Sequence, residues 1–446
     1  MAKKKEIQNQ TKDSHLQIAT GGEMINYRES WRIFRIMAEF VEGYQFLSGL
    51  KKEVTIFGSA RLPANSKYYQ IAEKLGHLLG KGGFTTITGG GPGIMEAANK
   101  GAFEAGGESA GINIQLPHEQ RINQYVNKSV GFYYFFSRKV MLTLPANVFV
   151  FFPGGFGTFD EFFEVVDYME LGQMRKTTVV LVGKEFWTPL LNFLNKKSSD
   201  EVNSVLKSDL LDLKVVDSAG DAYEYIKNAP DLPNLCIPGS TDWNCQGGTD
   251  WKIFRIMAEL VDGFEFLTKI NNNVTVLGTK SILPGSSYYK AAYDIGKILA
   301  ENKMTTMTGG GPGIMEATNK GAFEAGGESI GINMRFEHAE RRNNYLTKST
   351  SFFFPFIRKL IITSPAKFFV FFPGGFGTLH QLFEMLTLVE TKKIPPMPIL
   401  LYGKEFWQPL LDFISVLYSD FKTISVDDQK LVRVINRPEE IKEFLK

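Results

Sequence analysis

Short apolar runs alternate with longer amphipathic stretches along most of the chain. The runs are rich in β-branched or aromatic residues, and most are followed by glycine or proline; in the first half they are residues 54–57, 85–88, 110–114, 148–152 and 178–182. Continuous apolar runs are typical of strands that are covered on both faces, as in a parallel sheet. Ahead of them, an opening amphipathic helix is predicted by five residues at helical spacing, Trp31, Phe34, Met37, Val41 and Tyr44.

The whole pattern occurs twice. Residues 31–47 return at 251–267 with 12 of 17 positions identical, and residues 89–109 return at 309–329 with one change in 21. Both repeats are offset by 220 residues, far beyond the roughly 20–50 residues of a solenoid unit, so the duplicated unit is a domain. Because strands alternate with helices, we expect two tandem Rossmann-like α/β domains, each a mostly parallel sheet with helices on both faces.

Composition marks the domain boundaries. A stretch rich in Pro, Gly, Ser and Asn, without apolar periodicity, separates the copies, and a polar stretch precedes the first. We expect a polar tail at 1–25, a domain at 26–228, a linker at 229–250 and a second domain at 251–446.

Charge and cysteine content exclude several classes of protein. The chain has 446 residues, with 50 Lys and Arg against 48 Asp and Glu, so the net charge of +2 gives no basic excess for nucleic acid or anionic membranes. No apolar run reaches the roughly 18 residues that span a bilayer, and the basic N-terminus lacks a secretory apolar core. Cys236 and Cys245 with five histidines form no metal-ligand pattern. We therefore expect a cytoplasmic protein with no metal or cofactor.

Glycine-rich loops are the first candidate for chemistry. The segment 88–95 follows the second strand, where open parallel sheets bind their ligands. Glycines let the backbone approach a ligand, and the next helix points its amides at an anion. Its spacing is neither GxGxxG nor GxxxxGK[ST], which excludes the standard dinucleotide and P-loop sites. The substrate-binding residues expected here are Gly89, Gly90, Gly91, Gly93 and Met95; the alternative is a turn that binds nothing.

A second loop, residues 153–161, directly follows the run 148–152. Backbone amides and a hydroxyl for a phosphate are expected from Gly154, Gly155, Gly157 and Thr158. Glu161 comes one turn into the following helix, and Arg138 and Lys139 are the nearest candidate cations. Taken singly, Glu161 could serve the helix dipole and the two cations a solvated helix face. The aromatic run 132–136 and its repeat 352–356 could stack on a base, although packing is the commoner role.

The loop PGGFGTFDE at 153–161 resembles the PGGxGTxxE signature of the Lonely Guy family, long misnamed lysine decarboxylases. The segment from Gly89, the segment 116–120 and the run ending at Arg138 and Lys139 are also similar to it. The resemblance implies Rossmann-like dimers that hydrolyse the N-glycosidic bond of nucleoside monophosphates, with AMP or cytokinin riboside monophosphates as substrates. It implies that Arg138 and Glu161 are catalytic. A carboxylate beside the sugar suits this chemistry, because bond cleavage builds an oxocarbenium-like centre.

The second half departs from the signature, because Gln381 stands at the acidic position and His380 replaces Asp160. A neutral amide cannot act as a base, so we expect this half to be a degenerate site that still binds phosphate. Its expected residues are Gly309, Gly310, Gly311, Gly313, Arg358, Lys359, Gly374, Gly375, Gly377, Thr378 and Gln381.

We expect the two halves to pair as an intramolecular pseudo-dimer, with further homo-oligomers left open. The leading hypothesis is an AMP nucleosidase-like hydrolase acting on a small-molecule nucleotide. The alternative is a noncatalytic sensor or carrier of a nucleotide or phosphorylated cofactor. The preferred base does not follow from the sequence.

Overall fold

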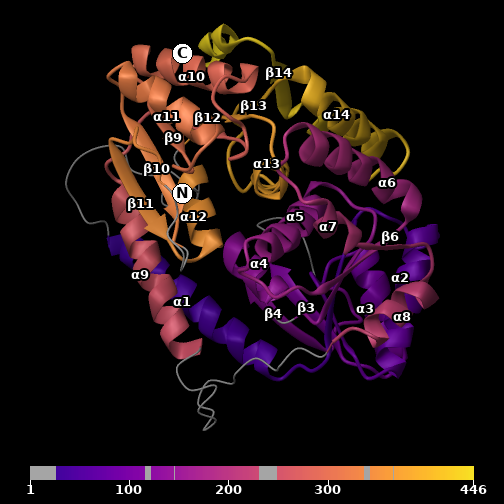
Figure 1. Cartoon of the computed structure of the whole chain (residues 1–446). Helices are drawn as coiled ribbons and strands as arrows, with labels where there is room; N and C mark the ends of the chain where they lie inside the picture. Colours follow the sequence, from indigo (N-terminus) through magenta and orange to yellow (C-terminus); the bar gives the residue numbers. More distant parts are fainter. Residues whose placement is uncertain are drawn as a thin grey trace, which may run out of the picture.

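Two α/β units face each other in the computed structural model of the chain (Figure 1). The structure describes residues 27–115, 122–144, 146–230, 249–335, 342–364 and 366–445. The predicted tail and nearly all of the predicted linker lie outside these residues, as do the segment 116–120 and both cysteines. In the described part of the chain, no helix combines the length and the apolar character needed to cross a bilayer.

Each half contains a seven-stranded, all-parallel sheet. The first sheet has the order β4-β3-β2-β1-β5-β6-β7, and the second repeats it as β11-β10-β9-β8-β12-β13-β14. The first-half strands are β1 (Glu53–Phe57), β2 (Thr85–Thr88), β3 (Ser109–Ile114), β4 (Lys128–Phe132), β5 (Val148–Phe151), β6 (Thr178–Val182) and β7 (Lys214–Val216). The second-half strands are β8 (Asn273–Leu277), β9 (Thr305–Thr308), β10 (Ser329–Met334), β11 (Lys348–Phe352), β12 (Ala366–Phe371), β13 (Ile399–Tyr402) and β14 (Val432–Ile435).

The helices of the two halves correspond as well. Those of the first half are α1 (Tyr27–Ser48), α2 (Lys67–Lys81), α3 (Ile94–Glu104), α4 (Phe135–Thr143), α5 (Phe156–Glu170), α6 (Lys184–Phe193), η1 (Leu194–Glu201), α7 (Lys207–Leu211) and α8 (Ala219–Lys227). Those of the second half are α9 (Thr249–Leu267), α10 (Ser287–Glu301), α11 (Ile314–Glu324), α12 (Pro355–Thr363), α13 (Phe376–Glu390), α14 (Lys404–Ser419), η2 (Asp428–Lys430) and η3 (Pro438–Phe444).

Alternate residues of each strand serve two different cores. In β1, Val54 and Ile56 pack with α2, α3 and α8, whereas Phe57 joins a cluster on the opposite face. That second cluster is continuous through both halves, whereas each half keeps a separate outer cluster. The apolar runs are therefore buried on both faces, and the inner face is the one shared between the halves.

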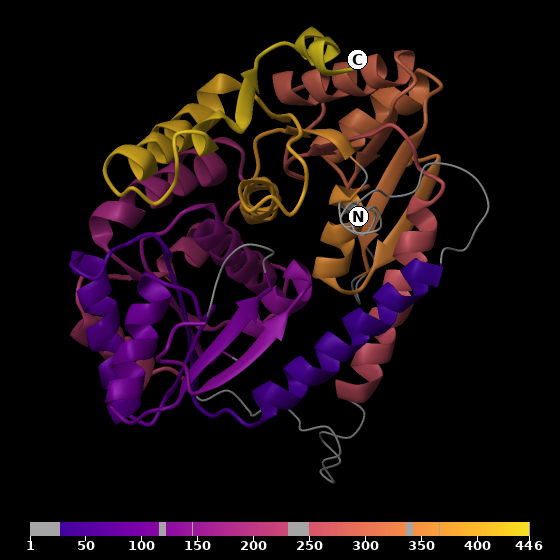
Figure 2. The same ribbon diagram turned by 180° about the vertical axis from the view of Figure 1, so that it is seen from behind.

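The halves meet through corresponding helices. Pairs α5 with α13, α1 with α9, α6 with α14, and α4 with α12 pack against one another. Figures 1 and 2 show α1 and α9 side by side at one edge and α6 and α14 at the other. Phe163 stacks on Phe383 at 5.4 Å between ring centroids, and Phe136 stacks on Phe356 at 6.2 Å. The predicted fold class and intramolecular pairing are confirmed.

Two details differ from the sequence expectation. The edge strands β4 and β7 were not predicted, because neither is a continuous apolar run. In α1, Tyr44 is buried as predicted, but Phe34 and Val41 are exposed (59% and 40%), and the helix also buries Ile36, Phe40 and Leu47. The helix is correct, but its buried stripe is rotated because it packs on α9 as well as on its own sheet.

Candidate functional site

The guanidinium of Arg138, which belongs to α4, lies against the loop after β2 at the C-terminal edge of the sheet. A Cβ at Gly89 would collide with Nη2 of Arg138 and lie 2.8 Å from Sδ of Met95, so a larger residue would displace these side chains. Nε of Arg138 donates to the Ile112 carbonyl of β3 at 2.9 Å. Gly93 has φ +68° and passes close to the Ser59 carbonyl, which explains glycine there. The predicted residues Gly89, Met95 and Arg138 are thus brought together.

Asn123 holds this loop in shape. Its side-chain amide donates to the carbonyls of Gly90 and Gly91 at 3.1 Å each and to Oδ1 of Asn99 at 3.0 Å. The Gly90 N–H donates to the Thr88 hydroxyl at 2.9 Å. These contacts, buried at Gly90 N–H and part-buried at Asn123, support the conformation of the loop.

The loop after β5 lies against the opposite half. A Cβ at Gly154 would overlap the Thr158 hydroxyl, so the two predicted phosphate ligands are adjacent. A Cβ at Gly155 would come within 2.7 Å of the Thr423 carbonyl and 3.2 Å of Ile424, both from the second half. Gly157, at the start of α5, lies near Thr387 of α13. The loop after β5 is therefore packed on the opposite half.

Arg138 and Glu161 form a buried pair next to these two loops. Nη1 of Arg138 lies 4.0 Å from Oε1 of Glu161, and the side chains are only 10% and 14% exposed. Arg138 comes from α4 and Glu161 from the second turn of α5. The loops, Arg138 and Glu161 together are called the first site below.

Burial controls the charge of this pair. Burial raises the pKa of Glu161 to about 7, although the positive charges of Arg138 and Lys139 pull it down. Burial also lowers the pKa of Arg138, and Glu161 and Asp160 oppose that shift. A carboxylate with a pKa near neutrality can change its protonation during a reaction, which suits general acid–base work.

Lys139 occupies a different place from the one predicted. Its ammonium is 2% exposed and lies 2.7 Å from Oδ1 of Asp160 and 3.3 Å from Oε2 of Glu164. It therefore belongs to a buried ion cluster between the halves, and we do not include it among the proposed ligands. Lys139 follows Arg138 by one residue on α4, so the two side chains leave the helix in different directions.

Lys359 is also part of that cluster. Nζ of Lys359 lies 2.7 Å from Oδ2 of Asp167, across the interface, and contacts His380 of its own half. Burial and the two neighbouring lysines lower the pKa of His380 well below its usual value, so the imidazole is neutral. We define the central cluster as Lys139, Asp160, Glu164, Asp167, Lys359, His380 and Glu384.

The second site, built from residues 309–315, 373–378, Arg358 and Gln381, repeats the first in its backbone. A Cβ at Gly309 would overlap Nη2 of Arg358, and one at Gly375 would overlap the Ser204 carbonyl of the first half. Nε of Arg358 donates to the Ile332 carbonyl at 2.8 Å. Within the described residues, Nε2 of the buried Gln381 makes no hydrogen bond. The second site therefore keeps the backbone arrangement of the first but has Gln381 in place of the Glu161 carboxylate.

The aromatic runs serve mainly as packing. Phe132 is fully buried, and Phe136 packs across the interface on Phe356. Tyr133 is different, because Arg35 lies 3.9 Å from its ring centroid and Lys393 of the second half lies 5.8 Å from it. Sequence reasoning missed the residues that reach a site from the opposite half, since no local signal marks them.

Similar proteins were found by sequence. A cytokinin riboside 5'-monophosphate phosphoribohydrolase of Rhodococcoides fascians is 28% identical over 149 residues, 32% of this chain and 74% of that protein. One from Mycobacterium marinum is 28% identical over 182 residues, 40% of this chain and 91% of that protein. One from Arabidopsis thaliana is 27% identical over 150 residues, 32% of this chain and 69% of that protein.

Solved structures gave weaker likenesses. A molybdenum cofactor binding protein of Rippkaea orientalis is 22% identical, covering 40% of this chain and 96% of that one, with a TM-score of 0.32. The molybdenum cofactor carrier protein of Chlamydomonas reinhardtii is 25% identical, covering 40% and 96%, with a TM-score of 0.31.

A family model described as "Possible lysine decarboxylase" matches residues 95–226 and again residues 315–445. One match falls in each half, and together they cover more than half of the chain. The chain therefore belongs to this family, the Lonely Guy family that its motifs resemble, and carries two copies of the family's domain.

Proposed function

We propose that the first site hydrolyses the N-glycosidic bond of a nucleoside 5'-monophosphate to a free base and ribose 5-phosphate. The observation that carries this proposal is the buried Arg138–Glu161 pair, 4.0 Å apart, next to two glycine-rich loops. The relatives named as phosphoribohydrolases of cytokinin riboside 5'-monophosphate support the reaction class. AMP, whose base lacks the cytokinin side chain, is the finer substrate that we propose.

Each part of the site has a role in the proposed reaction. The loop at Gly154–Thr158, at the start of α5, binds the phosphate through backbone amides and a hydroxyl. Glu161 then lies beside the ribose and stabilises positive charge as the glycosidic bond breaks. The bonding electron pair leaves with the base, which takes up a proton from solvent. Water adds to the sugar carbon and gives a proton to Glu161, which then releases it to solvent, so the net reaction consumes one water and leaves Glu161 unchanged.

The second site binds phosphate by the same loop geometry but does not hydrolyse at a useful rate. Its amide, Gln381, carries no charge and accepts no proton from water. The alternative function, noncatalytic binding of a nucleotide, is thus the function that we propose for this half alone.

Product analysis tests the proposal. Purified protein is incubated with AMP, GMP, CMP or UMP, and the products are separated by chromatography. We expect free base and ribose 5-phosphate in equal amounts from AMP, and none from adenosine, which lacks the phosphate. Recovery of every nucleotide intact at high enzyme concentration would contradict the hydrolase and leave a binding protein.

A further inference from the structure

A lysine of the second half lies at the first site. Lys393 follows the C-terminal end of α13, and its Nζ donates to the Gln115 carbonyl of the first half at 3.4 Å. Gln115 directly follows β3, and the same Nζ lies 5.8 Å from the Tyr133 ring centroid. Its described hydrogen bond is thus to a neutral carbonyl.

This position is at the Arg138 end of the first site. Arg138 is bonded to β3 through Ile112, and Lys393 lies beyond the end of the same strand. The phosphate loop follows β5, which is three strands away in the order β3-β2-β1-β5, or roughly 14 Å at the usual strand spacing. If phosphate occupies the β5 loop and ribose lies at Glu161, the β3 end is left for the base.

The electrostatic surroundings agree with this placement. Burial and the positive charge of Arg138 lower the pKa of Lys393, and Glu39 opposes the shift. Glu39 itself accepts hydrogen bonds from the backbone N–H groups of Tyr133 and Tyr134 at 2.8 and 3.3 Å. Two cations therefore lie close together, where a ligand with acceptor atoms would be favoured.

The second half has the same arrangement at the end of β10, but its positive charge stands at the other of two corresponding positions. We call this arrangement, the end of β3 or β10 and the segment facing it, a corner. Gln173 corresponds to Lys393, and both backbone N–H groups bond the carbonyl five residues earlier, Tyr168 and Leu388. Arg335 corresponds to Gln115, and both N–H groups bond the neighbouring edge strand at 2.7 Å.

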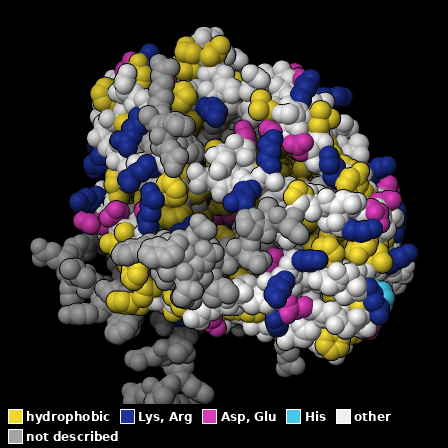
Figure 3. Space-filling model, turned by 60° about the horizontal axis from the view of Figure 1, so that its bottom comes forward, with side chains coloured by type: hydrophobic (Ala, Val, Ile, Leu, Met, Phe, Trp, Pro, Cys, Tyr) yellow, Lys and Arg dark blue, Asp and Glu magenta, His cyan; other side chains and the backbone are white. Residues whose placement is uncertain are grey.

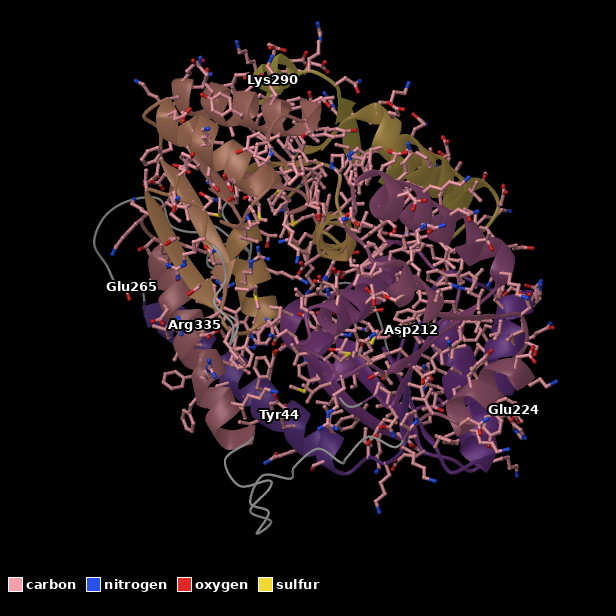
Figure 4. The ribbon with its side chains drawn as sticks, viewed as in Figure 1. Tyr44, Asp212, Glu224, Glu265, Lys290 and Arg335 are labelled. Carbon is pink, nitrogen blue, oxygen red and sulfur yellow. The ribbon has the colours of Figure 1, made fainter. Side chains whose placement is uncertain are left out.

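At these two positions, each corner therefore has one cation and one glutamine. In the first site the cation comes from the opposite half, whereas in the second it comes from the same half. Nη2 of Arg335 donates to the Ser351 carbonyl at 3.3 Å, and Figure 4 shows this side chain beyond the ends of β10 and β11. The exchange retains, at each corner, a positive charge from one of these two positions.

We propose that Lys393 is a substrate-binding residue of the first site, supplied by the second half, that donates a hydrogen bond to an acceptor on the nucleobase. Every purine presents an acceptor at N7, and in 6-oxopurines O6 adds a second; lysine and arginine commonly bind that pair. The departing base gains negative charge, so the ammonium also stabilises the leaving group. This inference rests on the proposed function, because it takes the base to lie away from the phosphate loop.

Full-length variants separate this role from that of a tether between the halves. Lys393→Gln places in the first site the residue that the second half carries at 173. We expect kcat/KM for AMP to fall, and the inhibition constant of free adenine to rise, roughly tenfold to hundredfold, as for a lost charged hydrogen bond. The inhibition constant of ribose 5-phosphate stays the same, because the phosphate loop is untouched.

Two further variants serve as controls. Lys392→Gln removes the neighbouring exposed charge and leaves these constants unchanged. Gln115→Arg combined with Lys393→Gln moves the cation to its own half, as at Arg335, and recovers most of the lost kcat/KM. A lower melting temperature of Lys393→Gln with unchanged inhibition constants would mean a tether and overturn the inference, as would a change confined to ribose 5-phosphate.

Wild-type turnover tests the proposed function separately. If the wild type released no base from any nucleotide, the hydrolase proposal would fail, and calorimetric binding of AMP would decide the role of Lys393. Lys393→Gln should then weaken AMP binding by the same factor without affecting ribose 5-phosphate. Equal AMP affinity in the two proteins would overturn the inference.

Discussion

The ammonium of Lys359, in the second half, lies 2.7 Å from the carboxylate of Asp167, in the first. The internal repeat gives Lys139 as the counterpart of Lys359, yet Lys139 takes its carboxylate from Asp160 of its own half. Where the second half has His380 in place of that aspartate, the first half supplies Asp167, whose own counterpart is Thr387. The sequence differences between the two halves are therefore complementary at this interface.

Removing one member of the Lys359–Asp167 pair should be costly. Lys359→Met leaves the Asp167 carboxylate buried without its cation, and we expect it to lower the free energy of unfolding by about 3–5 kcal/mol. The double variant with Asp167→Leu should lose less, because it leaves no uncompensated charge. Urea unfolding measures both.

A solvent-exposed pair is the matched control. Lys430→Met breaks the Lys430–Asp427 pair, whose side chains are 71% and 84% exposed, and should cost less than about 1 kcal/mol. Equal losses from Lys359→Met and Lys430→Met would contradict the importance of the cross-interface pair. The ion pair holds the pKa of Asp167 below its usual value, so its stabilisation is present above the unfolded-state pKa and is lost as pH falls through the folded one.

The rate should depend on pH through Glu161. Its pKa of about 7 means that the carboxyl is mostly protonated below that pH and ionised above it. Because we propose that the ionised form stabilises the sugar cation, we expect kcat/KM for AMP to rise with pH through about 7 and then to level off. A profile measured from acidic to alkaline pH checks this; a rate that falls as pH rises through 7 would assign the acid form instead.

Restoring the second carboxylate should restore part of the activity. In a protein with Glu161→Gln, the added change Gln381→Glu places a carboxylate in the second site, where Arg358 and the phosphate loop are retained. We expect base release at least about tenfold above that of Glu161→Gln alone, within the range that a positioned acid–base group contributes. Identical rates in the two proteins would show that the second site lacks more than its acid.

Gly155 should resist enlargement, because the opposite half is packed on it. An added Cβ would lie 2.7 Å from the Thr423 carbonyl, whereas one at Gly49 would meet its nearest atom at 3.7 Å. Gly155→Ala should therefore displace the phosphate loop, at a cost of about 1–3 kcal/mol, and raise KM for AMP. Gly49→Ala should change neither KM nor stability; an unchanged KM in Gly155→Ala would argue against phosphate binding at this loop.

Much of the fold was predictable from local pattern. The apolar runs identify five strands of the first sheet because central parallel strands are buried on both faces. The edge strand β4 was not predicted, because its sequence, KSVGF, mixes polar and apolar residues without a clear period. The buried face of α1 was not fully predicted, because packing against α9, far along the chain, determines which side of the helix is covered.

The site residues divide in the same way, into those that a local motif predicts and those whose position depends on packing. Arg138 and Glu161 follow from a motif and are brought together by two elements of one half. Lys139 was misplaced because its partner on α5 and its depth in the interface are set by packing. Lys393 could not be found, since its position depends on how the halves dock. Gln115 and Lys393 correspond to Arg335 and Gln173. This exchange of a cation with a glutamine is recognised only when the two halves are compared in the structure.

Base release by Glu161→Gln is the most direct test of the central claim. The wild type and the variant are incubated with AMP at equal concentration, with Glu185→Gln, the same change at an exposed position, as control. We predict that Glu161→Gln loses roughly a hundredfold to ten-thousandfold in kcat and that Glu185→Gln keeps the wild-type rate. Release of adenine by Glu161→Gln at the wild-type rate would contradict the account.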